Sequence, residues 1–102
     1  MDIHPLLASS VMDWGGERVV VLLTGQPEPG HPGRYRLEAT VVAERAPGQG
    51  LRLVARWKGG RRTVRVNRAG QAHLRGVPAG VVEAVRAGDP QALFLGIERA
   101  GE

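Results

Sequence analysis

The pair Gly59-Gly60 is the feature that most constrains the fold, because a run of alternating residues lies on each side of it. Two adjacent glycines suit a two-residue hairpin turn, in which the backbone needs positive φ. We therefore expect two antiparallel strands over residues 51–58 and 61–67, with Lys58 facing Arg61 and Leu53 facing Val66. A slip of one residue would turn arginines into the core, so the turn and the pattern support each other. The inward set is Leu53, Ala55, Trp57, Val64 and Val66.

The same alternation continues outside this hairpin. From Tyr35 to Ala43 every second residue is apolar, which is typical of a strand with one buried face. Residues 18–24 form a nearly continuous apolar run, and shorter strand candidates follow at 71–74, 81–86 and 93–97. Gly and Pro residues separate these segments. About seven short strands at this spacing predict an all-β fold, a seven-stranded antiparallel β-sandwich.

The first sixteen residues do not follow the alternation. Pro5 can begin a short helix in which Leu7, Val11 and Trp14 share one side, before Gly15-Gly16 ends it. We therefore expect an N-terminal helix or arm over residues 1–16, which covers an open end of the sandwich or docks onto a partner. Residues 17–102 are expected to form a single β-sandwich domain, since a chain of 102 residues has room for one core.

Residues 69–82 contain a turn, an alternating strand and a Val-Pro-x-Gly corner. This pattern resembles the signature of carboxypeptidase regulatory-like domains, which are transthyretin-like (prealbumin-like) β-sandwiches. The matching positions are Gly70, Ala72, Leu74, Val77, Pro78 and Gly80. The resemblance implies a non-catalytic accessory or adhesion module. One relative of this fold hydrolyses a ureide and ends in Tyr-Arg-Gly-Ser, whereas this sequence ends in Arg99-Ala100-Gly101-Glu102, which argues against that activity.

Composition bears on the compartment. The chain has no cysteine, which excludes disulfides and cysteine-based zinc sites and fits a reducing environment. The N-terminus carries Asp2 where a signal peptide has Lys or Arg, and the aliphatic run at 19–23 is far shorter than a membrane span. We expect a cytoplasmic protein without a membrane partner.

The residues that could carry chemistry are scattered. His4, His31 and His73 are too far apart in sequence for a local metal motif, and the serines at positions 9 and 10 stand beside no base. An enzyme would need His31 and His73 to converge on a carboxylate in a pocket. We therefore expect no enzyme, no cofactor and no metal.

Positive charge is concentrated in the middle of the sequence. The formal net charge is +4, and residues 34–75 hold eleven basic residues against Glu38 and Glu44. The outward face of the predicted hairpin contains no acidic residue, and no aromatic residue, because Trp57 and Tyr35 alternate inward. Its cationic residues, which form the candidate partner-binding site, are Arg52, Arg56, Lys58, Arg61 and Arg65.

Three interpretations of this face stand side by side. It is a solvated surface of a composition rich in arginine, or it binds an acidic protein surface, or it binds the phosphate backbone of a nucleic acid through the same arginines. The acidic protein surface is the partner we expect. The run Lys58-Gly59-Gly60-Arg61 lacks the spacing of a P-loop, so its glycines serve the turn. The sequence indicates no particular oligomeric state.

Overall fold

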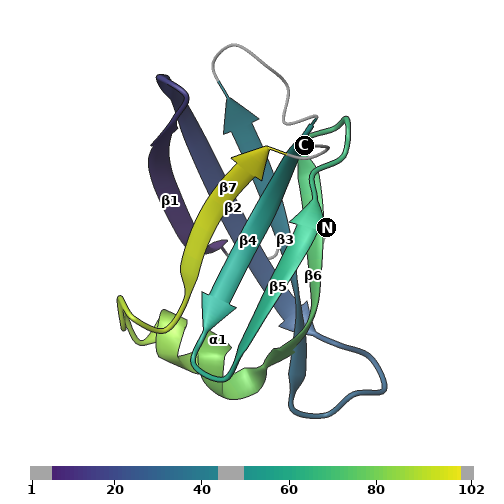
Figure 1. The fold of residues 1–102 in the computed structure, drawn as a ribbon. Helices are drawn as coiled ribbons and strands as arrows, with labels where there is room; N and C mark the ends of the chain where they lie inside the picture. The colour runs from purple at the N-terminus through teal and green to yellow at the C-terminus, as the bar shows by residue number, and fades with distance from the viewer. Residues whose placement is uncertain (1–5, 44–49, 100–102) are drawn as a thin grey trace.

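The computed structural model describes residues 6–43 and 50–99, and in these ranges the chain forms seven strands and one short helix (Figure 1). The elements are β1 (Leu6–Trp14), β2 (Glu17–Pro27), β3 (Arg34–Ala43), β4 (Leu51–Trp57), β5 (Gly60–Arg65), β6 (Gln71–Pro78), α1 (Ala79–Arg86) and β7 (Phe94–Arg99). The strands make two antiparallel sheets, with the orders β1-β2-β3-β6 and β5-β4-β7. The predicted all-β sandwich of about seven strands is confirmed.

The two sheets pack face to face, and Figure 1 shows the three-stranded sheet in front of the four-stranded one, with α1 at the lower end. Every second residue of the inner strands points into the space between the sheets, as the period of a strand requires. The buried core consists of Val19, Val21, Leu23, Leu37, Ala39, Val41, Leu51, Leu53, Ala55, Trp57, Val66, Ala72, Leu74, Val77 and Val82. Among the described residues this core holds no polar or charged side chain.

The hairpin between β4 and β5 forms, but its turn lies one residue earlier than predicted. Trp57 pairs with Gly60, so Lys58 and Gly59 occupy the turn and the predicted pairing of Lys58 with Arg61 is wrong. Gly59 adopts the positive φ of 92°. Gly60 is required for packing instead, because a Cβ there would lie 2.8 Å from Nε1 of Trp57. Every predicted pair shifts by two positions, and a shift by an even number leaves each side chain on its predicted face.

Residues 6–14 form strand β1, so the prediction of an N-terminal helix or arm is wrong for this segment, and residues 1–5 lie outside the described ranges. Gly15 and Gly16 have φ values of 60° and 78°, and two positive values are typical of the type I′ turn that joins adjacent strands. Val11 pairs with Val20, and its side chain is 64% exposed on the outer surface. The segment therefore extends the four-stranded sheet as an edge strand.

Residues 81–86, predicted as a strand, lie in α1 instead. Pro78 is the N-cap, where its fixed φ and missing N–H cost the helix nothing. Val82 is buried under the helix, and Gly88, with a φ of 86°, donates its amide hydrogen to the carbonyl of Val85 to close the C-terminus. The Val-Pro-x-Gly corner that resembles the transthyretin-like signature is therefore followed by α1 and not by the predicted strand.

Candidate binding face on the three-stranded sheet

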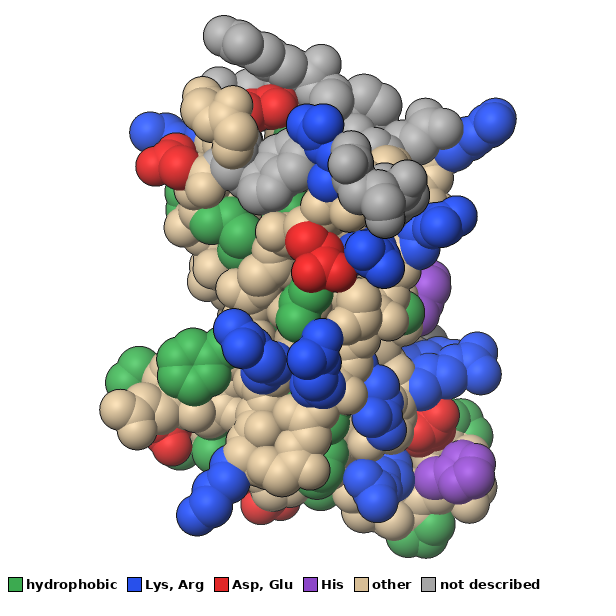
Figure 2. All heavy atoms as spheres, in the orientation of Figure 1, with side chains coloured by type: hydrophobic (Ala, Val, Ile, Leu, Met, Phe, Trp, Pro, Cys, Tyr) green, Lys and Arg blue, Asp and Glu red, His purple; other side chains and the backbone are tan. Residues whose placement is uncertain are grey.

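The outward side chains of β4, β5 and β7 form three rows across the three-stranded sheet, which we call the outer face. Each row takes one residue from each strand, because residues that are paired in the register lie opposite one another. The rows are Arg61–Arg56–Phe94, Thr63–Val54–Gly96 and Arg65–Arg52–Glu98. Figure 2 shows this side of the molecule, with Lys and Arg side chains over its centre and its right flank.

Two of the rows bring arginines directly opposite each other. Arg56 pairs with Arg61, and Arg52 pairs with Arg65. Cross-strand pairs carry energies of about 0.2–1 kcal/mol in a sheet, and like charges in opposite positions are destabilising. The register that we predicted did not contain these two pairs, so the structure shows a stronger conflict between like charges than the sequence indicated.

The hydrogen-bonding pattern of β4 brings these arginine pairs close together. The Val66 amide donates to the Leu51 carbonyl at 2.9 Å. Backbone groups change side at each residue of a strand, so Arg52 and Arg56 direct their N–H and C=O groups toward β7. Their pairs with β5 are therefore of the non-hydrogen-bonded kind, in which opposite side chains approach most closely.

One acidic residue joins the outer face from β7, whereas the outward side chains of the hairpin itself include no acid, as predicted. Oε1 of Glu98 lies 3.3 Å from Nε of Arg52. That Nε atom makes no hydrogen bond in the described structure, so the contact is an ion pair held by charge alone. Both side chains are about half exposed, where an ion pair contributes little to stability. Arg56, Arg61 and Arg65 form no ion pair with a described acidic residue.

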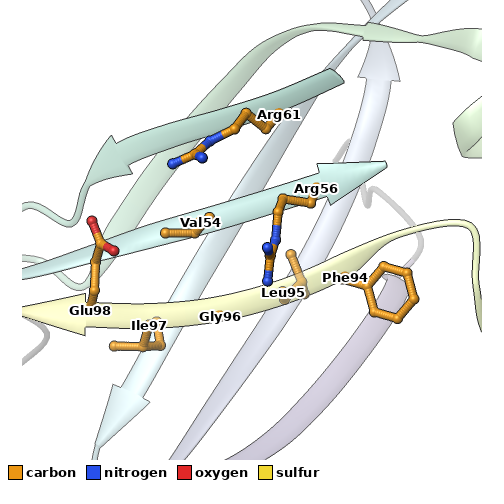
Figure 3. A pocket seen from close by; sticks show the side chains of 8 residues that line it. All are labelled: Val54, Arg56, Arg61, Phe94, Leu95, Gly96, Ile97 and Glu98. Carbon is orange, nitrogen blue, oxygen red and sulfur yellow. The ribbon is translucent and has the colours of Figure 1, made fainter. Parts of the chain in front are cut away.

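The outer face is hollowed above Gly96, and we call this hollow the Gly96 notch. A Cβ at Gly96 would meet no atom within 4 Å. Figure 3 shows Arg56 extending from β4 over β7 toward this opening, with Phe94 on one side and Glu98 on the other. The notch has a volume of about 270 Å³ and is lined by Val54, Arg56, Arg61, Phe94, Leu95, Gly96, Ile97 and Glu98.

Phe94 adds an aromatic side chain that the sequence interpretation missed. The residue is 54% exposed, and its position pairs with Arg56. A second, wider hollow of about 560 Å³ adjoins it, lined by Arg56, Trp57, Lys58, Gln91 and Phe94. The local pattern predicted a strand at 93–97 but gave no sign that this strand lies beside β4, which is what places Phe94 and Glu98 next to the arginines.

The predicted site residues are thus only partly brought together. Arg52, Arg56, Arg61 and Arg65 share the outer face, whereas Lys58 lies in the turn at one end of it. Asn67, the last residue of the predicted strand 61–67, lies beyond the end of β5. Its Oδ1 accepts hydrogen bonds from the amides that follow, at 2.9 Å from Ala69 N and 2.9 Å from Gln71 N. Asn67 therefore organises the turn between β5 and β6.

A further arginine, Arg62, lies on the opposite side of β5. Its guanidinium stacks over the ring of Trp57, 5.8 Å from the centroid. Its Nε donates to the carbonyl of Arg75 in β6 at 3.2 Å. Arg62 thus connects the two sheets at the β5 edge, and its side chain has a structural role.

The two described histidines, His31 and His73, lie at the surface of the molecule. His31 lies exposed in the loop between β2 and β3, and His73 is exposed on β6 opposite Glu38. His4 lies outside the described residues. Within residues 6–43 and 50–99, no group of three or more His, Asp and Glu side chains is arranged to hold a metal ion.

Comparison with known proteins identified no relative of this chain. No family model matches the chain, and neither a curated protein nor a solved structure matches it. The transthyretin-like resemblance therefore stays a prediction. In the described parts of the chain, no helix has the length and apolar character needed to cross a bilayer.

Proposed function

We propose that this chain is a non-catalytic, cytoplasmic binding module that attaches to an acidic surface of a protein partner through the outer face. The observation that carries the proposal is the register, which places two pairs of arginines opposite each other, Arg56 with Arg61 and Arg52 with Arg65. A sheet that served stability alone would gain from neutral or oppositely charged pairs at these positions. A carboxylate placed between two such arginines replaces their repulsion with attraction.

Arginine is the side chain best suited to this task. Its planar guanidinium binds a carboxylate with two parallel hydrogen bonds, and it sheds water more readily than an ammonium group does. The resemblance to carboxypeptidase regulatory-like domains supports the same proposal, because that family consists mainly of accessory modules. The cytoplasmic location rests on the absence of cysteine from the sequence.

Nucleic acid is the second candidate, and Phe94 is the observation that favours it. An exposed aromatic ring beside an arginine suits the stacking of an unpaired base. Glu98 opposes this candidate, because a carboxylate on the same face repels phosphate. We therefore place the acidic protein partner first.

Fluorescence anisotropy with two labelled probes, polyglutamate and single-stranded oligothymidine, tests the proposal. The full chain is titrated at about 50 mM and about 200 mM salt. We expect polyglutamate to bind, and the double variant Arg56→Glu/Arg61→Glu to bind at least about tenfold more weakly. The control Arg18→Glu/Arg68→Glu changes the net charge equally at two exposed positions off this face and should retain binding.

Each other outcome has a definite meaning. If oligothymidine binds preferentially, about three phosphate contacts should lower its affinity roughly 20-fold between the two salt concentrations. That result would identify nucleic acid as the partner of the outer face. Equal loss in the control variant would show that net charge, and not the outer face, attracts the probe. Failure of both probes to bind at the lower salt would refute the proposal.

A further inference from the structure

Strand β7 presents backbone groups to the outside of the three-stranded sheet. It bonds to β4 through Phe94, Gly96 and Glu98, the partners of the β4 residues whose backbone groups point toward it. Leu95 and Ile97 therefore direct their N–H and C=O groups to the opposite side. The strand order β5-β4-β7 places no described strand there. Such a row of groups is a template for the addition of another strand.

The other edge of the same sheet is different. Strand β5 lies next to β6 in Figure 1, and Arg62 connects the two through its hydrogen bond to the Arg75 carbonyl. A Cβ at Gly76 in β6 would lie 3.3 Å from the guanidinium of Arg62, so this side chain packs closely against β6. Strand addition is therefore favoured at β7 and hindered at β5.

The Gly96 notch gives this open edge a chemical preference. A strand added to β7 would place one outward side chain directly opposite Gly96, where no side chain blocks the way. An acidic side chain at that position would extend across the notch to the guanidinium of Arg56, which reaches into the notch from β4 (Figure 3). Glycine at this position leaves the arginine open to a partner.

The neighbouring positions define the rest of the pattern. An aromatic or aliphatic residue fits opposite the exposed ring of Phe94, and a cation fits opposite Glu98. The residues between these three would turn inward beside Leu95 and Ile97, which are partly buried against the core, so apolar residues suit them. The complementary segment alternates in the order cation, apolar, acid, apolar, aromatic.

We propose that an extended acidic segment of the partner adds to β7 as a fourth strand, with its carboxylate in the Gly96 notch against Arg56. This inference rests on the proposed function of the outer face and specifies the form in which the partner binds. Backbone hydrogen bonds to Leu95 and Ile97 supply affinity, and the notch supplies the selection for acid.

Synthetic peptides with the sequence Lys-Val-Glu-Val-Tyr at their centre test the inference. One matched peptide carries Gln in place of Glu, and another carries N-methyl groups on both valines, which removes the donors that face β7. We expect each change to weaken binding to the full chain at least about tenfold. Amide hydrogen exchange should slow at Leu95 and Ile97 when the parent peptide binds, and stay unchanged at Arg61 and Thr63, whose amides point away from β4 on the β5 edge.

Protein variants test the notch directly. Gly96→Val fills it in a strand position where a Cβ meets open space, so the fold should be retained while peptide binding falls at least about tenfold. Gly96→Ala is the smaller version, to be used if the valine variant unfolds. Thr40→Val on the outer surface of the four-stranded sheet is the matched control and should bind as the parent chain does.

The outcomes separate this inference from the proposed function. If the acidic peptide binds but neither N-methylation nor Gly96→Val weakens it, strand addition is overturned and the outer face still binds acid. If neither this peptide nor polyglutamate binds, the proposed function fails. A doubled mass without peptide, abolished by Gly96→Val, would assign the edge to a second copy, whose Glu98 lies opposite Gly96 when two β7 strands pair about Ile97. That result would overturn the peptide inference.

Discussion

Replacing Arg61 with threonine should make the protein more stable, because it removes one of two cations that face each other across β4 and β5. Arg61 lies opposite Arg56 in a non-hydrogen-bonded pair, where side chains are closest. For scale, Coulomb's law gives a repulsion of about 0.7 kcal/mol for two unit charges at a separation of about 6 Å in water. Cross-strand pairs of side chains in sheets carry energies of the same order, about 0.2–1 kcal/mol. We therefore expect the free energy of unfolding to rise by about 0.7 kcal/mol at low salt.

Urea unfolding of the full chain measures this change. A domain of this size loses about 1 kcal/mol of stability per molar urea, so the midpoint should rise by about 0.7 M in dilute buffer. At about 1 M salt the screening length falls to about 3 Å, and the difference between variant and parent should largely disappear. Arg68→Thr in the turn between β5 and β6, where no strand partner faces the side chain, is the control and should show no change that depends on salt.

Three results would refute the reasoning. A midpoint that stays the same or falls in dilute buffer would show that the arginine pair is not in conflict. A gain that persists at high salt would trace the effect to the strand preference of threonine, which salt does not screen. An equal gain in Arg68→Thr would trace it to net charge.

Further changes in stability follow from the core and the turns, and urea unfolding measures each. Leu53→Ala removes a side chain with no exposed area from the central strand and should cost about 2–5 kcal/mol; a loss below about 1 kcal/mol would contradict the packing described. Gly70→Ala combines a φ of 79° with a Cβ only 2.8 Å from the carbonyl oxygen of Val41, so it should cost more than Gly88→Ala, which has a φ of 86° and open space. Gly88→Ala should lower the free energy of unfolding by about 1–2 kcal/mol. An equal loss of stability in Gly70→Ala and Gly88→Ala would refute the role of the close contact at Gly70. Arg62→Ala should cost about 1 kcal/mol through the lost stacking and hydrogen bond, and Arg62→Lys should recover only part of it.

The faces of the central hairpin were predictable from sequence because they depend on a period of two. Leu53, Ala55 and Trp57 lie in the core as the alternation indicates. The position of the turn was not predictable in the same way, since Gly59 and Gly60 both permit it. Packing of the Trp57 ring over Gly60 selects between the two, and that contact is not visible in a local pattern.

Two segments were exchanged in the prediction, which is why the number of strands agrees. Leu7 and Val11 are spaced as on a helix, but Ala8, Ser10 and Met12 form the inward face of β1, and small or polar residues make a weak strand signal. The valines near α1 favour a strand by propensity. Pro78 before them and Gly88 after them form the ends of a helix, and these ends determine the result.

The candidate site shows the same division between local and long-range information. Arg52, Arg56, Arg61 and Arg65 were predictable because they belong to one hairpin. Glu98, Phe94 and Gly96 were not, because they join the outer face only through the pairing of β7 with β4. The notch itself is the product of two strands that are distant in sequence.

The pairing of β4 with β7 also implies an order in which the strand pairs form during synthesis. During synthesis β4 and β5 emerge one after the other and can close their hairpin at once. The opposite edge of β4 must wait for β6, α1 and β7, because Leu51 pairs with Arg99 and Arg56 with Phe94. Pairings between such distant residues are slow to form. Until they do, we expect Leu53 and Ala55 to expose an apolar surface on an incomplete sheet, which would favour aggregation of the nascent chain in that interval.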